Sequence, residues 1–223
     1  MAHYQRHHVL TTIYDQAVMP LFYTPSVEDG KKLLRACYDG GGRLVEFTNR
    51  GDFAHEVFGE LNKYAVAEMP GMILGVGSIV DAPTAALYLQ LGANFIVSAS
   101  MRDDVALVCN RRKVAYLPGC SSLTEIARAE EMGCEIVKLF PGSLYGPGFI
   151  KAVTAPQPWT SIMPTGGVSP DEDNMTEWYR AGAVCLGMGS QMINQKVVDS
   201  GNFAALSDQV RDTLALSRRL RGK

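Results

Sequence analysis

Short apolar segments alternate with longer amphipathic segments along most of this chain. The short segments are rich in Val, Ile and Leu and have few charges, a pattern typical of parallel strands that are buried on both faces. We predict strands over residues 17–23, 43–48, 72–76, 94–98, 113–117, 135–140, 161–164 and 183–188. The spacing between them leaves room for one helix after each strand.

Helix-start residues follow several of these strands. Ser26, Asp81 and Ser122 are well placed to cap helix N-termini, and Gly133 is placed to end a helix. We predict helices over 26–39, 52–68, a segment beginning at 81, 102–110, 122–132, 147–153, 170–180 and 203–220. Residues 3–16 precede the first strand and predict an additional helix or arm.

This alternation predicts an α/β fold with a parallel sheet, and eight strand–helix units suggest closure into a (β/α)8 TIM barrel. We expect one domain over residues 1–223, with residues 1–16 as an N-terminal helical extension. An open doubly wound sheet is the main alternative. The G-x-G-x-x-G pattern of dinucleotide-binding sheets does not follow the first strand, which weakens that alternative.

Composition narrows the classes of partner. The chain has 223 residues and a formal net charge of -2, so it has no general attraction to nucleic acid or to an anionic membrane. No apolar run approaches the ~20 residues that span a bilayer. Five widely spaced cysteines without a C-x-x-C pair indicate free thiols in a reducing compartment, so we expect a cytoplasmic protein. With four histidines, mostly near the N-terminus, we expect no metal site.

One lysine stands out, because Lys138 lies inside the apolar segment 135–140. Lysine is rarely buried, and burial without a partner disfavours its ammonium form. A neutral amine can attack a carbonyl and form a Schiff base. The alternative is a strand-end lysine whose amine reaches water.

Polar residues also share one face of the second predicted strand. Because side chains alternate along a strand, Glu46, Thr48 and Arg50 point to the same side. If that side faces the barrel interior, Glu46 and Arg50 meet Lys138 at the barrel mouth. A buried ion pair without chemistry would explain the same residues, although polar residues gathered at carboxyl ends of strands are typical of a barrel active site.

Glycines and hydroxyl groups follow several strands at the end where barrels bind substrates. The turns after the seventh and eighth strands, 165–167 and 187–190, take the position at which these barrels usually hold phosphate. Each turn alone would be an ordinary tight connection. Together they indicate a phosphate site.

In these residues the chain resembles the class I aldolases of the 2-keto-3-deoxy-6-phosphogluconate (KDPG) and 4-hydroxy-2-oxoglutarate (KHG) family. The resemblance extends over about residues 17–193. The segments that carry it are 41–50 (GGRLVEFTNR), 75–78 (GVGS), 95–98 (FIVS), 118–119 (PG), 138–141 (KLFP) and 164–167 (PTGG).

The resemblance implies a role for each candidate site residue. Lys138 would form the Schiff base with C2 of a 2-keto acid, and Glu46 would be the general acid and base. Arg50 and Ser78 would hold the substrate carboxylate, and Phe140 would pack on the methyl group of pyruvate. The remaining residues would line the substrate pocket and bind phosphate: Pro118, Thr165, Gly166, Gly167, Gly187 and Ser190. The covalent imine would need no metal or other cofactor, the partner would be a small 2-keto acid, and a homotrimer is expected.

Departures from the family pattern leave the substrate open among KDPG, its galactonate epimer and KHG. Ser78 stands where threonine is usual, and Asn49 stands where an apolar residue is usual. Two other classes fit the fold less well. One is another phosphate-binding barrel, such as an epimerase or a thiamine-phosphate-synthase-like enzyme, which would not need Lys138. The other is a barrel that binds keto acids without turnover, which would not need both Lys138 and Glu46.

Overall fold

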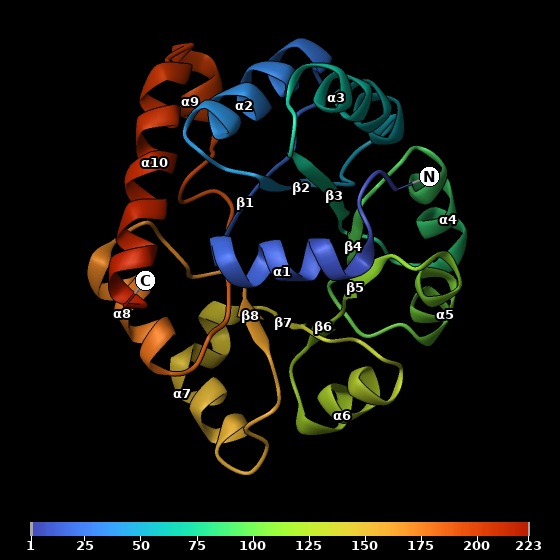
Figure 1. The fold of residues 1–223 in the computed structure, drawn as a ribbon, viewed down its shortest axis with the longest axis vertical. Helices are drawn as coiled ribbons and strands as arrows, with labels where there is room; N and C mark the ends of the chain where they lie inside the picture. Colours follow the sequence, from blue (N-terminus) through green and yellow to red (C-terminus); the bar gives the residue numbers. More distant parts are fainter. Residues whose placement is uncertain (1, 223) are drawn as a thin grey trace.

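Parallel strands form a ring at the centre of this computed structural model, which describes residues 2–222, and helices surround the ring (Figure 1). Met1 and Lys223, the ends of the expected domain, lie outside the described residues. The strands are β1 Val18–Phe22, β2 Leu44–Thr48, β3 Ile73–Gly77, β4 Phe95–Val97, β5 Ala115–Leu117, β6 Gly119–Cys120, β7 Val137–Leu139, β8 Ile162–Pro164 and β9 Leu186–Met188.

The strand order follows the chain around the ring. One sheet has the order β5-β4-β3-β2-β1-β9, and a second has the order β6-β7-β8. A parallel bridge between Thr165 and Gly187 connects the end of β8 to β9. On the other side, Pro118 separates β5 from β6, because proline has no N–H to donate to a ladder. The strand predicted over 113–117 corresponds to β5, and β6 is a short strand beyond its predicted end. The (β/α)8 prediction is confirmed.

The helices form the outer layer. They are α1 Arg6–Gln16, α2 Val27–Asp39, α3 Ala54–Glu68, α4 Ala82–Gln90, α5 Asp103–Arg112, α6 Leu123–Glu131, α7 Gly142–Thr154, α8 Glu172–Arg180, α9 Gln195–Ser200 and α10 Phe203–Leu220. The predicted caps are present, since Ser26, Asp81 and Ser122 each accept a hydrogen bond from a backbone N–H in the first turn.

Two helices differ from the sequence prediction. Helix α7 begins at Gly142 and kinks at Gly146, so the predicted segment 147–153 is only its second part. The short α9 has no counterpart in the prediction.

Helix α1 lies across the centre of the ring of strands (Figure 1). Its Val9 and Ile13 are fully buried and belong to the same apolar cluster as the interior side chains of the barrel. That cluster includes Leu44 of β2 and Ile136, which precedes β7. A larger cluster lies between the strands and the outer helices. The segment predicted as a helix or arm thus covers the amino-terminal end of the barrel, opposite to the carboxyl ends of the strands.

Candidate active site

Glu46 and Lys138 meet inside the barrel, although they lie on strands far apart in the sequence. Glu46 on β2 is 1% exposed and Lys138 on β7 is 6% exposed. The distance from Lys138 Nζ to Glu46 Oε1 is 3.9 Å. The residues two positions earlier on each chain segment, Leu44 and Ile136, are both in the interior cluster. Strand alternation therefore explains why both polar side chains face inward above an apolar layer.

Burial dominates the electrostatics of Glu46. It raises the pKa of the Glu46 carboxyl above its ordinary value, while the charges of Lys138 and Arg50 act in the opposite direction. Glu46 Oε2 is buried and has no hydrogen-bond partner within residues 2–222. A carboxyl group with a raised pKa and one free oxygen is suited to exchange protons with a bound molecule.

Two glycines make room for polar groups at the barrel mouth. A Cβ atom on Gly77 of β3 would lie 1.7 Å from Glu46 Oε1, and one on Gly187 of β9 would lie 2.3 Å from Thr165 Oγ1. Thr165 is 6% exposed, and its hydroxyl group is another buried polar atom without a partner in the described structure. Glycine at these two positions is therefore required for the carboxyl group and the hydroxyl group to occupy their places.

Arg50 and Ser78 follow the ends of β2 and β3. Arg50 is exposed, and its charge acts on Glu46 without a direct contact. Ser78 is half-buried and has φ 60°, in the left-handed region that is costly for a residue other than glycine. Backbone strain of this kind concentrates at functional sites, and here it fixes the turn that follows β3 beside Glu46.

Phe140 and Pro118 border Lys138 from two sides. The Nζ atom of Lys138 lies 5.2 Å from the centre of the Phe140 ring, within the range of an amine–aromatic contact. The buried Pro118 accepts a 2.8 Å hydrogen bond at its carbonyl oxygen from the Lys138 N–H. Pro118 therefore holds the backbone of Lys138.

The parallel bridge between Thr165 and Gly187 places the turn after β8 beside β9 and the turn that follows it. Gly166 is half-buried, whereas Gly167 and Ser190 are exposed. Thr165 also accepts a 2.8 Å hydrogen bond at its carbonyl oxygen from the N–H of Gly142, which begins α7. The expected phosphate residues are therefore at one side of the mouth, and Lys138 and Glu46 are inside it.

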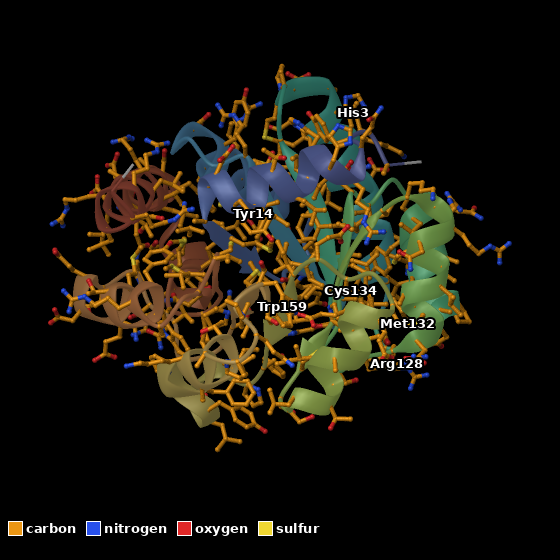
Figure 2. All side chains as sticks on the ribbon, turned by 60° about the horizontal axis from the view of Figure 1, so that its bottom comes forward. His3, Tyr14, Arg128, Met132, Cys134 and Trp159 are labelled. Atoms are coloured by element: carbon orange, nitrogen blue, oxygen red, sulfur yellow. The ribbon has the colours of Figure 1, made fainter. Side chains whose placement is uncertain are left out.

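A separate cavity lies at the other end of the barrel. It has a volume of about 620 Å³ and is lined by His3, Arg6, Arg112, Lys113 and Glu135 among others. Figure 2 shows His3 near one end of α1 and Tyr14 near the other. Neither Lys138 nor Glu46 borders this cavity, so it is distinct from the candidate active site.

Two other kinds of feature, a metal-binding cluster and a membrane-spanning helix, are absent from the described residues. Residues 2–222 contain no group of three or more His, Cys, Asp or Glu side chains that could hold a metal ion. None of the described helices is long and apolar enough to cross a membrane.

A barrel that places a buried lysine beside a buried carboxyl group has the arrangement typical of enzymes that form Schiff bases with carbonyl substrates. The family model for KDPG and KHG aldolase matches residues 9–209. A 2-dehydro-3-deoxy-phosphogluconate aldolase of Treponema pallidum is 31% identical over 201 residues, covering 89% of this chain and 92% of the relative. The corresponding enzyme of Pseudoalteromonas atlantica is 30% identical over 199 residues, covering 89% and 90%.

The chain therefore belongs to the KDPG and KHG aldolase family and is a carbon–carbon lyase. A crystal structure of a 4-hydroxy-2-oxoglutarate/2-dehydro-3-deoxyphosphogluconate aldolase from TTHB1 is 27% identical, with a TM-score of 0.78, and the match covers 94% of this chain and 98% of that one. A 2-dehydro-3-deoxy-6-phosphogalactonate aldolase of Escherichia coli is 32% identical over 125 residues, 54% of this chain and 58% of the relative.

Other structures show the fold alone. The KDPG aldolase of Legionella pneumophila, with pyruvate captured as a covalent carbinolamine, has a TM-score of 0.83 at 20% identity. It covers 92% of this chain and 97% of that one.

Sequence reasoning gave no role to two residues near the site. Asn49 follows β2, and its side-chain oxygen accepts a 2.8 Å hydrogen bond from the Tyr88 hydroxyl group on α4. Asn49 was visible as a polar residue at a position that is usually apolar. Tyr88 carried no signal, because one tyrosine in an apolar helix is an ordinary core residue.

Proposed function

We propose that this protein is a class I aldolase that cleaves 2-keto-3-deoxy-6-phosphogluconate to pyruvate and glyceraldehyde 3-phosphate. The observation that carries the proposal is the buried pair of Lys138 and Glu46, with 3.9 Å between amine and carboxyl group. Cleavage of 4-hydroxy-2-oxoglutarate to pyruvate and glyoxylate would use the same pair. The match to the aldolase family over residues 9–209 supports both reactions.

The proposed mechanism uses Lys138 as the nucleophile. Its neutral amine attacks C2 of the keto acid, Glu46 donates a proton to the carbinolamine hydroxyl group, and loss of water gives a protonated imine. The Glu46 carboxylate then removes the proton of the C4 hydroxyl group, the C3–C4 bond breaks, and its electron pair moves into the imine to form an enamine. The aldehyde product leaves, Glu46 returns the proton to C3 of the enamine, and hydrolysis releases pyruvate and restores Lys138. Because the imine accepts the electrons, the scheme needs no metal ion or other cofactor.

The surrounding residues would orient the keto acid. Arg50 and Ser78 are proposed to hold the carboxylate, since a guanidinium group can form two parallel bonds to it. Phe140, which already contacts the Lys138 amine, would pack on the methyl group of pyruvate. Thr165 and Gly166 would line the pocket near their strand end. Gly167, Gly187 and Ser190 would place N–H and hydroxyl donors around a phosphate group at the outer edge.

We also propose a cytoplasmic location and a homotrimeric assembly. All five cysteines are free and buried, which fits a reducing compartment. Sedimentation equilibrium of the purified protein tests the assembly, with the mass of three chains as the expected result. A monomer or a dimer would contradict it.

A panel of three substrates tests the proposed activity. KDPG, its galactonate epimer and KHG would be offered separately, with pyruvate release measured for each. We expect KDPG to have the highest kcat/KM, and Lys138→Met to abolish release from all of them. Preference for the epimer would assign the chain to the activity of its Escherichia coli relative instead. Release that survives in Lys138→Met would exclude the Schiff-base mechanism.

Ser190 provides a test of the phosphate position. Ser190→Ala removes one hydroxyl donor from an exposed turn, so we expect KM for KDPG to rise about three- to tenfold, as for the loss of one hydrogen bond. KM for KHG, which carries no phosphate, should stay within about twofold of wild type. Equal effects on the two substrates would show that Ser190 does not contact phosphate.

A further inference from the structure

Arg50 lacks a side-chain partner that would fix it at the barrel mouth. Within the part of the chain that the structure describes, its guanidinium group forms no hydrogen bond or ion pair with another residue. An arginine without a partner loses side-chain freedom when it binds a carboxylate, and a firmly held backbone limits the further freedom that binding must remove.

Asn49, the residue before Arg50, provides that hold through two hydrogen bonds on two sides, and the Arg50 backbone adds a third. Asn49 donates its N–H to the carbonyl oxygen of Gly77 at 2.8 Å, which extends the β2–β3 ladder by one residue. Its side-chain oxygen accepts the 2.8 Å bond from the Tyr88 hydroxyl group. The Arg50 N–H bonds back to the carbonyl oxygen of Thr48 at 2.9 Å. The bond to Tyr88 connects this turn to α4.

Tyr88 is itself well fixed. It is 1% exposed, and its ring packs edge-on against Phe58 of α3 with 5.1 Å between ring centres. Burial raises the pKa of its phenol to about 12, so the group stays a neutral donor throughout the range in which the enzyme works. A buried phenol is also costly to leave unpaired, which favours one position of the half-buried Asn49.

We infer that the Tyr88–Asn49 hydrogen bond is a positioning device for Arg50, and that it sets the affinity of the site for the carboxylate of the keto acid. The inference rests on the proposed function, because it assigns carboxylate binding to Arg50. Tyr88 and Asn49 are positioning residues that touch no substrate themselves. Their effect reaches the substrate through the backbone that joins Asn49 to Arg50.

The test is borohydride trapping over a range of pyruvate concentrations. In Tyr88→Phe we expect the half-saturating pyruvate concentration to rise about three- to tenfold, with the maximal trapping rate within about twofold of wild type. Pyruvamide, a carbonyl compound of similar shape without the carboxylate, should show the same half-saturation in both proteins. Equal shifts for pyruvate and pyruvamide would overturn the inference, because the bond would then be only structural.

Two further variants isolate the pathway. In Asn49→Leu the acceptor is gone, so adding Tyr88→Phe should raise the half-saturating concentration no further. In Arg50→Ala, Tyr88→Phe should likewise have no additional effect. Independent, multiplicative effects in either background would contradict the inference.

Tyr14→Phe is the matched control, since the Tyr14 hydroxyl group bonds Ser161 Oγ at 2.8 Å from α1, at the opposite end of the barrel. It loses a comparable bond and should leave pyruvate half-saturation unchanged. If wild type itself traps no pyruvate, the proposed function fails and this inference fails with it. If wild type traps pyruvate and Tyr88→Phe equals it, only the positioning inference is overturned.

Discussion

Two buried ionisable side chains define the chemistry of this molecule at the scale of single residues. Glu46 and Lys138 are 3.9 Å apart, close enough to share a proton through a bound molecule and too far for a tight hydrogen bond. Burial of either one alone would be strongly unfavourable. Their joint presence at the barrel mouth, with Glu46 Oε2 unpaired in the described structure, is better explained by chemistry than by stability.

Glu46 should make the stability of the protein depend on pH. Its pKa is raised in the folded state, so the folded protein binds this proton more tightly than the unfolded chain does. The stability that this group contributes is present below its ordinary value of 4.5 and is lost as the pH rises from there through the folded-state pKa. We expect the free energy of unfolding of Glu46→Gln, relative to wild type, to increase with pH in that window.

Urea denaturation at a series of pH values measures this difference. When the pKa of a group differs by one between the folded and unfolded states, the free energy of unfolding changes by up to about 1.4 kcal/mol across the titration. Glu177→Gln, a change at an exposed position, is the control. The account would be contradicted if the free energy of unfolding of Glu46→Gln, relative to wild type, stayed constant or decreased as the pH rises.

At the scale of elements, β3 supports the site because its last residue, Gly77, has no side chain. Gly77 ends β3 and leaves the space that the Glu46 carboxyl group occupies from the neighbouring β2. The backbone conformation of Gly77 is one that residues other than glycine also adopt, because its φ is not positive. Only the close approach of Glu46 therefore requires glycine here.

Gly77→Ala should separate activity from folding. The added Cβ would displace the carboxyl group, which is the free end of a flexible side chain, so the fold should survive while Glu46 moves away from Lys138. A displacement of about 1 Å can reduce turnover on the order of 100-fold. We expect that loss in kcat for KDPG cleavage, with an unchanged circular dichroism spectrum.

Gly59→Ala in α3 is the control for this substitution. Its Cβ would meet Leu91 at 3.5 Å, an ordinary contact. Replacing a helical glycine by alanine should raise stability by about 0.5–1 kcal/mol without loss of activity. Wild-type kcat in Gly77→Ala would show that the position of Glu46 does not matter.

The elements also show what sequence patterns can predict. Hydroxyl and carboxylate caps are local, so Ser26, Asp81 and Ser122 identified three helix starts from the sequence. Strand alternation placed Glu46 and Lys138 on inward faces. The break at Pro118 depends on how β5 and β6 pair with different neighbours, and the Tyr88–Asn49 bond joins residues 39 positions apart. Proline at 118 favours a break along the chain, but which strands pair and which distant side chains meet is set by the closed ring.

At the scale of the whole molecule, the barrel has one reactive end and one covered end. Helix α1 places Val9 and Ile13 against the interior side chains, so the apolar layer continues from the helix to the level of Leu44 and Ile136. Glu46 and Lys138 lie above that layer at the opposite end. The first helix therefore completes the core and keeps water from entering beneath the active site.

Ile13→Ala tests this arrangement. The side chain is 0% exposed, and truncation of a buried isoleucine costs about 2–5 kcal/mol. We expect that decrease in the free energy of unfolding, measured by urea denaturation. Thr11→Ala, at an exposed position of the same helix, should change it by about 0.5 kcal/mol or less. A loss below about 1 kcal/mol in Ile13→Ala would mean that α1 does not complete the core.

Borohydride reduction in the presence of pyruvate, followed by intact and peptide mass spectrometry, tests the central claim most directly. A class I aldolase should gain a reduced pyruvate adduct on the peptide that contains Lys138, and Lys138→Met should gain none. The folded wild-type protein at saturating pyruvate, left without an adduct or modified only at another lysine, would contradict the assignment of Lys138 as the Schiff-base residue.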